Sequence, residues 1–184
     1  MSGLRPSQED RFVLVPSFFD PKASFCGVFD GTVGDHASEF ISRNIVSILC
    51  SQPAIRDAQE GLFAPSAEPI PMDATALKIR QALRATFLEA DQALINHCAE
   101  RGLHYASSTG VVVFIWGNLL SVAHIGDSKA CIAKQVGDQI FPEWLTVDHK
   151  PNMPSELSRI EQCGGSLVWL HGNKPFIRYV SLQF

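Results

Sequence analysis

The stretch GVFDGTVGDHASEF, residues 27–40, joins a strand pattern to a helix pattern through closely spaced glycines. Asp30 ends the apolar run SFCGVF, residues 24–29, so a carboxylate is expected at the end of a buried strand. Gly31 follows directly, and a glycine lets the backbone turn there and expose a carbonyl. Mg²⁺ and Mn²⁺ prefer carboxylate, carbonyl and water oxygens, so this junction is a candidate cradle for a hard cation.

A second acidic pair, Glu9 and Asp10, precedes the strand-like segment RFVLV, residues 11–15. Antiparallel pairing of this segment with residues 24–29 would bring the two acidic clusters together. The plain alternative is that Asp30 belongs to a turn and that the first pair is a solvated strand start. In an arbitrary sequence this alternative is the more common one, and the residues alone leave both interpretations open.

Outside this junction, apolar residues recur with helical or strand periodicity along most of the chain. The pattern predicts, in order, a helix at 37–49, a long helix from Asp73 to Gly102, strands at 109–116 and 119–125 joined by Gly117-Asn118, a strand at 129–135, a short helix at 155–163 and strand character from 166 to 184. This order favours an α+β fold in which antiparallel β-sheets are layered with α-helices. Residues 51–72 contain four prolines and little periodicity, and are interpreted as a surface loop.

The composition fits a single domain, residues 1–184, because 46% of the side chains are apolar and a chain of this length can bury a core without disulfides. The net charge of -4 and the lack of a Lys/Arg cluster argue against nucleic acid and anionic membranes as partners. No signal peptide or membrane-spanning stretch is visible, so the cytoplasm or the nucleus is the expected location. Five cysteines without a Cys-x-x-Cys pair are interpreted as reduced thiols, and zinc is not indicated.

Several short segments stand out along the chain: RPSQED (5–10), GVFDG (27–31), SSTGV (107–111), VAHIGDSKA (122–130) and LTVDHKP (145–151), the last followed by Glu156, Arg159-Ile160 and Gly164-Gly165. In this order they resemble the motifs of the metal-dependent protein phosphatases, the PPM or type 2C serine/threonine family. The resemblance covers nearly the whole chain. It implies the four-layer β-sandwich of PPM phosphatases, incomplete at the C-terminus, and hydrolysis of phosphoserine and phosphothreonine in phosphoprotein substrates.

The resemblance also implies a role for each matching position. Asp30 would bridge two Mn²⁺ or Mg²⁺ ions, the Gly31 carbonyl and Glu9 would each bind one of them, Asp10 would stand behind these ligands, Asp127 would supply a weaker third metal site, and Arg5 would hold the substrate phosphate. A guanidinium suits that last role because its planar fork matches two oxygens of a phosphate. A water activated by the two cations would attack phosphorus in line, with Asp30 and Arg5 as the catalytic residues and no phosphoenzyme.

The chain departs from the family pattern directly after the central motif. Thr32 stands where the family has His, so the usual candidate for a general acid is missing. His36 is close in sequence, but it falls at the start of the predicted helix and is interpreted as an exposed helix residue. A serine alkoxide leaves poorly without a proton, so activity on phosphoproteins is expected to be lowered.

A second departure concerns the C-terminal part of the chain. The family has two more metal-binding aspartates, in Asp-Gly and Asp-Asn motifs, and nothing after Gly165 resembles them. The chain therefore resembles the N-terminal part of the family's domain, and alone it would lack part of the metal site. Two hypotheses follow: a Mn²⁺/Mg²⁺-dependent serine/threonine phosphatase or part of one, and a catalytically impaired pseudophosphatase acting as a binding or regulatory module. Thr32 and the missing downstream aspartates favour the second hypothesis, whereas the first is favoured by the intact Arg5, Glu9, Asp30 and Asp127.

Overall fold

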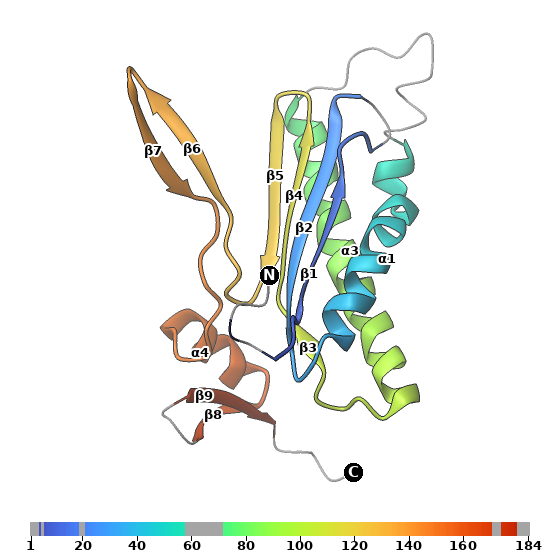
Figure 1. The fold of residues 1–184 in the computed structure, drawn as a ribbon, viewed down its shortest axis with the longest axis vertical. Coiled ribbons are helices and arrows are strands. Elements are labelled where there is room, and N and C mark those ends of the chain that lie inside the picture. The colour runs from blue at the N-terminus through green and yellow to red at the C-terminus, as the bar shows by residue number, and fades with distance from the viewer. Residues whose placement is uncertain (1–3, 5, 19–20, 58–71, 171–173, 180–184) are drawn as a thin grey trace. The chain divides into compact units, whose positions relative to one another are not determined.

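The computed structural model describes residues 4, 6–18, 21–57, 72–170 and 174–179 (Figure 1). The chain divides into two compact units, Met1–Thr146 and Val147–Phe184, and each is considered by itself. Both units combine antiparallel strand pairs with helices, and this confirms the predicted α+β class. The expectation that residues 1–184 form one domain stays a prediction.

An antiparallel sheet forms the centre of the first unit. Its strands are β1 (Asp10–Val15), β2 (Ala23–Thr32), β3 (Ser107–Ser108), β4 (Gly110–Trp116) and β5 (Leu119–Ile125). The order is β1-β2-β4-β5, and the short β3 pairs with the end of β2. Between β4 and β5 the turn residue Gly117 has a φ of 57°, which a glycine adopts without a steric penalty. The predicted hairpin at 109–125 is thus confirmed.

Two helices, α1 (His36–Ser51) and α3 (Met72–Arg101), cover one face of this sheet (Figure 1). Alternate residues of the strands point towards them because side chains in a strand alternate between its two faces. The resulting core contains Phe25, Phe29, Val112 and Phe114 from the sheet, Ile45 and Leu49 from α1, and Ile79, Ala82, Leu83 and Ala90 from α3. Each fully buried phenylalanine contributes about 1.5–3 kcal/mol. Both predicted helices are therefore confirmed by the side chains that they bury.

The opposite face of the same sheet is apolar and exposed. Phe12 and Leu14 of β1 are 75% and 62% exposed, and Val28, Ile115 and Leu120 on the other strands are also exposed. The register places Phe12 opposite Val28 and Ile115 opposite Leu120, and Leu14 belongs to the row between these two pairs, so the five side chains share one face of the sheet. We call these five residues the open face. Contiguous apolar surface of this kind is typical of a sheet that packs against another layer.

A β-hairpin extends the first unit beyond the sheet. It consists of β6 (Cys131–Val136) and β7 (Gln139–Trp144), and all its residues are exposed. The Lys129 ammonium lies 5.6 Å from the centre of the Trp144 ring, a cation–π contact at the base of the hairpin. The sequence predicted the first of these strands but not the second.

The second unit contains one helix and one hairpin. These are α4 (Pro154–Gln162), β8 (Gly165–Leu170) and β9 (Lys174–Tyr179), and β8 pairs with β9. Proline at the first helical position fits the start of α4, and Gly164, with a φ of 77°, follows its end. Buried Ile160 lies on this helix, which packs against β8. The predicted short helix is confirmed, and the strand character after residue 166 belongs to this hairpin.

The proline-containing segment 51–72 is described only at its ends. Residues 53–57 are helical and Ile55 is buried in the core, residues 58–71 lie outside the described residues, and α3 begins at residue 72. Among the helices of the described residues, none has the length and the apolar character that crossing a membrane requires.

The two faces of the sheet predict opposite results for the same substitution. Phe25→Ala should lower the free energy of unfolding by about 3–5 kcal/mol, because Phe25 is 1% exposed and its removal leaves a cavity in the core. Phe12→Ala, on the open face, should change it by no more than about 0.5 kcal/mol. Urea denaturation of both variants measures the difference. Equal losses would show that the open face is covered in solution.

Candidate metal centre

Two carboxylates lie across from each other where β1 begins and β2 approaches its end. Asp10 is directly opposite Asp30 in the strand register, and both side chains lie on the same side of the sheet as the open face. Cβ atoms of such cross-strand pairs are about 4.5–5.5 Å apart. Like charges in this position destabilise a sheet, so a cation bound between them would stabilise it. The Gln8 side-chain amide also donates a hydrogen bond to Asp10 Oδ2 at 3.0 Å.

Thr109 fixes the backbone of Asp30 from the segment between β3 and β4. The Asp30 N–H donates to Thr109 Oγ1 at 3.1 Å, and the Thr109 N–H donates to the Asp30 carbonyl at 2.9 Å. Ser108 Oγ donates to the same carbonyl at 3.1 Å. The direction of the Asp30 Cα–Cβ bond is therefore set by hydrogen bonds to the N–H and to the carbonyl of this residue. This role of Thr109 does not follow from the sequence alone, although the Ser-Ser-Thr run before a strand was a signal for it.

Gly31 lies where a side chain has no room. A Cβ atom at this position would be 2.8 Å from each of three oxygens: the carbonyls of Glu9 and Gly34 and the hydroxyl of Ser38. The Gly31 N–H donates to the Glu9 carbonyl at 3.3 Å, and Ser38 Oγ also donates to that carbonyl. This close approach brings the Glu9 backbone, the end of β2 and the start of α1 together. It explains why a glycine follows Asp30.

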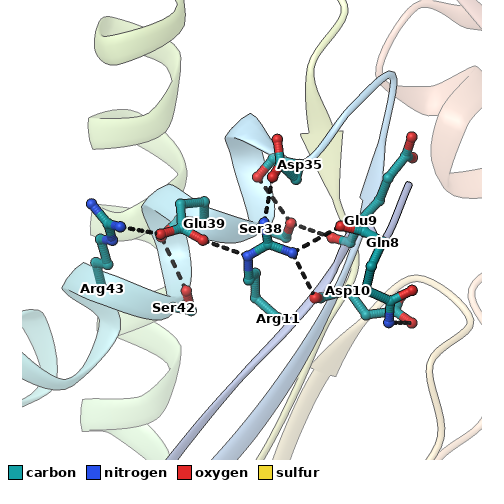
Figure 2. Close-up of polar contacts among 9 residues, drawn as sticks. All are labelled: Gln8, Glu9, Asp10, Arg11, Asp35, Ser38, Glu39, Ser42 and Arg43. Atoms are coloured by element: carbon teal, nitrogen blue, oxygen red, sulfur yellow. Dashed lines mark hydrogen bonds and ion pairs between the residues drawn. The ribbon is translucent and has the colours of Figure 1, made fainter. Parts of the chain in front are cut away.

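Arg11 stands at the centre of a polar network between β1 and α1 (Figure 2). Its guanidinium pairs with Asp35 and Glu39 near the start of α1 and donates to the Gln8 and Asp10 carbonyls, both at 2.9 Å. The hydrogen bond from Arg11 holds the pKa of the Glu39 carboxyl below its usual value, and Glu39 in turn raises the pKa of Arg11. The sequence alone did not indicate a role for Arg11, because its carboxylate partners lie 24 and 28 residues further along the chain.

Asp127 belongs to a turn that is tied to the same place. The turn follows β5, and Gly126 there has a φ of 82° and packs so closely on Thr109 that a Cβ atom would be 2.8 Å from Thr109 Cγ2. Ser128 Oγ lies 2.6 Å from Thr109 Oγ1, the atom that also accepts from Asp30. Asp127 itself is exposed between these two anchors. The connection from Ser128 through Thr109 to Asp30 brings this turn into the neighbourhood of the candidate site.

The remaining predicted residues have different outcomes. Arg5 lies outside the described residues. Thr32, the last residue of β2, is exposed and pairs with Ser107. His36 is the exposed first residue of α1, as the sequence indicated. Val33, between these two, has a φ of 61°, a left-handed conformation that costs a β-branched residue energy and that a glycine would adopt freely.

The chemistry of these groups suits a hard divalent cation. Asp10, Asp30 and Glu9 offer carboxylate oxygens, and Gly31 offers a carbonyl in a crowded place where only a glycine fits. Sulfur and imidazole ligands, which zinc and copper prefer, do not converge here in the described part of the chain. Within the same residues, no group of three His, Cys, Asp or Glu side chains is assembled to hold a metal ion. The residue types therefore suit magnesium or manganese by their oxygen chemistry, while in the described part of the chain their side chains are not gathered into a metal site.

Comparison with known proteins identifies the family. A sequence model described as "Protein phosphatase 2C" matches residues 1–176. The chain is 32% identical over 169 residues to "Probable protein phosphatase 2C 56" of Oryza sativa subsp. japonica, covering 91% of this chain and 41% of that protein. It is 29% identical over 175 residues to "Protein phosphatase 2C 1" of Paramecium tetraurelia, covering 90% of this chain and 50% of that protein.

A solved structure agrees with this result. The serine-threonine phosphatase 2C from Toxoplasma gondii matches with a TM-score of 0.84 and 38% sequence identity, over 95% of this chain and 56% of that chain. The present chain belongs to the protein phosphatase 2C family, as its sequence motifs indicated. It spans about half the length of the relatives that it matches.

The Arg11–Glu39 pair predicts an acid-sensitive contribution to stability. Because the folded pKa of Glu39 is depressed, the pair stabilises the fold above the unfolded pKa, about 4.3, and the contribution is lost as the pH falls through the lower folded value. Glu39→Gln should therefore lose less stability than the wild type between pH 7 and pH 3. The free energy of unfolding at pH 7 and pH 3, measured by denaturation, tests this. Glu100→Gln, near the end of α3, is the control and should behave as the wild type does. Equal losses in the wild type and Glu39→Gln would contradict the prediction.

Proposed function

We propose that this chain forms part of a Mn²⁺- or Mg²⁺-dependent protein phosphatase that hydrolyses phosphoserine and phosphothreonine. The observation that carries the proposal is the pairing of Asp10 with Asp30 beside the Gly31 cradle. Membership of the protein phosphatase 2C family supports the same reaction class. The proposal extends to two ions at this site and a third, weaker one at Asp127.

The chain's own residues would hold and orient the metal centre. Asp30 would bridge two ions, since Thr109 and Ser108 fix its backbone and leave its carboxylate on the open side of the sheet. Glu9 and the Gly31 carbonyl would each bind one ion, and Asp10 would support Asp30 from the neighbouring strand. When bound, such ions lower the pKa of a water and make it a nucleophile at neutral pH.

The substrate phosphate needs a separate positive group. Arg5 is proposed for this role because a guanidinium can donate two parallel hydrogen bonds to phosphate oxygens and stay charged at every relevant pH. Its donation would neutralise charge that develops on phosphorus oxygens as the leaving group departs. No side chain of this chain is assigned to protonate the leaving group, because the Thr32 hydroxyl is too weak an acid to act as a general acid near neutral pH.

Metal binding should depend on Asp30. Asp30→Asn keeps the size of the side chain but removes its charge, so it should weaken Mn²⁺ binding by more than about 100-fold. This exceeds the loss of affinity expected for a residue that only orients a metal ligand. Titration calorimetry measures the dissociation constant. Asp138→Asn, in the exposed turn between β6 and β7, is the matched control and should bind as the wild type does. Unchanged binding in Asp30→Asn would remove the metal-site assignment.

Thr32 should produce a leaving-group effect in the phosphatase that contains this sequence. A general acid contributes about 10²–10⁴-fold, mainly when the departing oxygen is strongly basic. Thr32→His should therefore speed hydrolysis of phosphoserine peptides and leave that of nitrophenyl phosphate nearly unchanged. It should also introduce a pKa of about 6.5 into the pH profile of peptide hydrolysis.

The control for this experiment is Mn²⁺ affinity, which the substitution should leave unchanged. If peptide hydrolysis and its pH profile stay as in the wild type, protons reach the leaving group by a route that does not involve this position. If neither the wild type nor Thr32→His hydrolyses either substrate, the proposed function itself is contradicted.

A further inference from the structure

We propose that Arg11 is a positioning residue that sets the direction of the Glu9 side chain for metal binding. This inference rests on the proposed function, because Glu9 is assigned there as a metal ligand. Arg11 would not itself be a metal ligand. Its effect is transmitted through the backbone on either side of Glu9.

Three successive carbonyls are held in this region (Figure 2). One nitrogen of Arg11, Nη1, donates to both the Gln8 and the Asp10 carbonyl, each at 2.9 Å. The carbonyl between them, that of Glu9, accepts from Gly31 N–H at 3.3 Å and from Ser38 Oγ. The peptide groups on both sides of Glu9 are therefore fixed, although this residue precedes β1 and lies outside its ladder. With these peptide planes fixed, the direction of the Cα–Cβ bond of Glu9 is fixed too.

The guanidinium is itself held from the other side. Its Nε pairs with Glu39 and its Nη2 with Asp35, so all three nitrogens have a partner. Because the guanidinium is rigid and planar, its two ion pairs at α1 determine where Nη1 points. The Arg11 side chain is 27% exposed and pairs with two carboxylates, and these contacts restrict the positions that its guanidinium can take. Arg11 thus relates the start of α1 to the backbone around Glu9.

Charge and geometry predict opposite signs for removal of Arg11. A cation near a metal site opposes metal binding by repulsion, so loss of its charge alone would tighten Mn²⁺ binding. Asp35 and Glu39 neutralise much of that charge, which leaves the geometric effect dominant. Loss of the clamp releases the backbone around Glu9, and residues that orient metal ligands typically contribute about 10–100-fold in metal affinity.

The decisive experiment compares Arg11→Ala, Arg11→Lys and Arg43→Ala by Mn²⁺ calorimetry and thermal unfolding. Arg11→Ala should weaken Mn²⁺ binding about 10–100-fold. Arg11→Lys keeps the charge but cannot bridge two carbonyls and two carboxylates, so it should recover only part of the loss. Arg43→Ala removes the other ion pair of Glu39, which involves a 75% exposed arginine one turn further along α1, and the variant should bind Mn²⁺ within about threefold of wild type.

A purely structural role would lower the unfolding midpoint and leave the Mn²⁺ dissociation constant of the folded protein unchanged. An unchanged dissociation constant in Arg11→Ala would overturn the proposal. So would tighter Mn²⁺ binding in Arg11→Ala, or a loss of Mn²⁺ affinity in Arg43→Ala as large as that in Arg11→Ala. Hydrogen exchange of the Gly31 amide, which donates to Glu9, provides a metal-free readout. It should become faster in Arg11→Ala and stay as in the wild type in Arg43→Ala.

The two readouts separate this proposal from the proposed function. If the wild type binds no Mn²⁺, the metal assignment fails, and exchange of the Gly31 amide alone decides whether Arg11 fixes the backbone at Glu9. If the wild type binds Mn²⁺ and both the affinity and the exchange are unaffected by Arg11→Ala, the positioning role fails and the metal assignment stands.

Discussion

The antiparallel pairing of β1 with β2 is the constraint on which the rest of the first unit depends. Its register directs Phe25 and Phe29 towards α1 and α3 and, on the other face, places Asp10 across from Asp30. A slip of one residue would exchange the two faces, so that buried phenylalanines would become exposed and Asp30 would point into the core. The hydrophobic core therefore enforces the position of the carboxylates, because the register that buries these phenylalanines is also the one that pairs the acids.

Gly31 is the second requirement, because it decides how closely α1 approaches the end of the sheet. Three oxygens crowd the place where its Cβ would be, and two of them, from Glu9 and Ser38, are also hydrogen-bonded to each other. Any larger residue would separate the start of α1 from β1 by pushing these groups apart. That separation would also break the contacts of Arg11 with Asp35. The absence of a side chain at Gly31 thus permits both the backbone contacts and the ion pairs around the candidate site.

The sequence predicted the elements with strong local signals, and the structure confirms them: the alternating strands, the helix periodicity and the Gly117 turn. It pointed to Asp30 through its place after an apolar run and through the motif that it belongs to. It missed β7, because Pro142 lies inside that strand and a proline, which has no N–H for the ladder, argues against a strand. The contacts of Arg11 with Glu39 and of Thr109 with Asp30 join residues 28 and 79 positions apart, so they follow from the strand register and from no local pattern.

The candidate site also depends on what lies over the open face. Asp10 and Asp30 share that side of the sheet with Phe12 and Val28, which are exposed apolar neighbours in the next row. A layer that packs on this face would remove water from the carboxylates as well as from the apolar side chains. In the lower dielectric their mutual repulsion would grow, and so would their attraction for a cation between them. Packing of such a layer and metal binding would therefore stabilise each other, since each reduces the free-energy cost of the other.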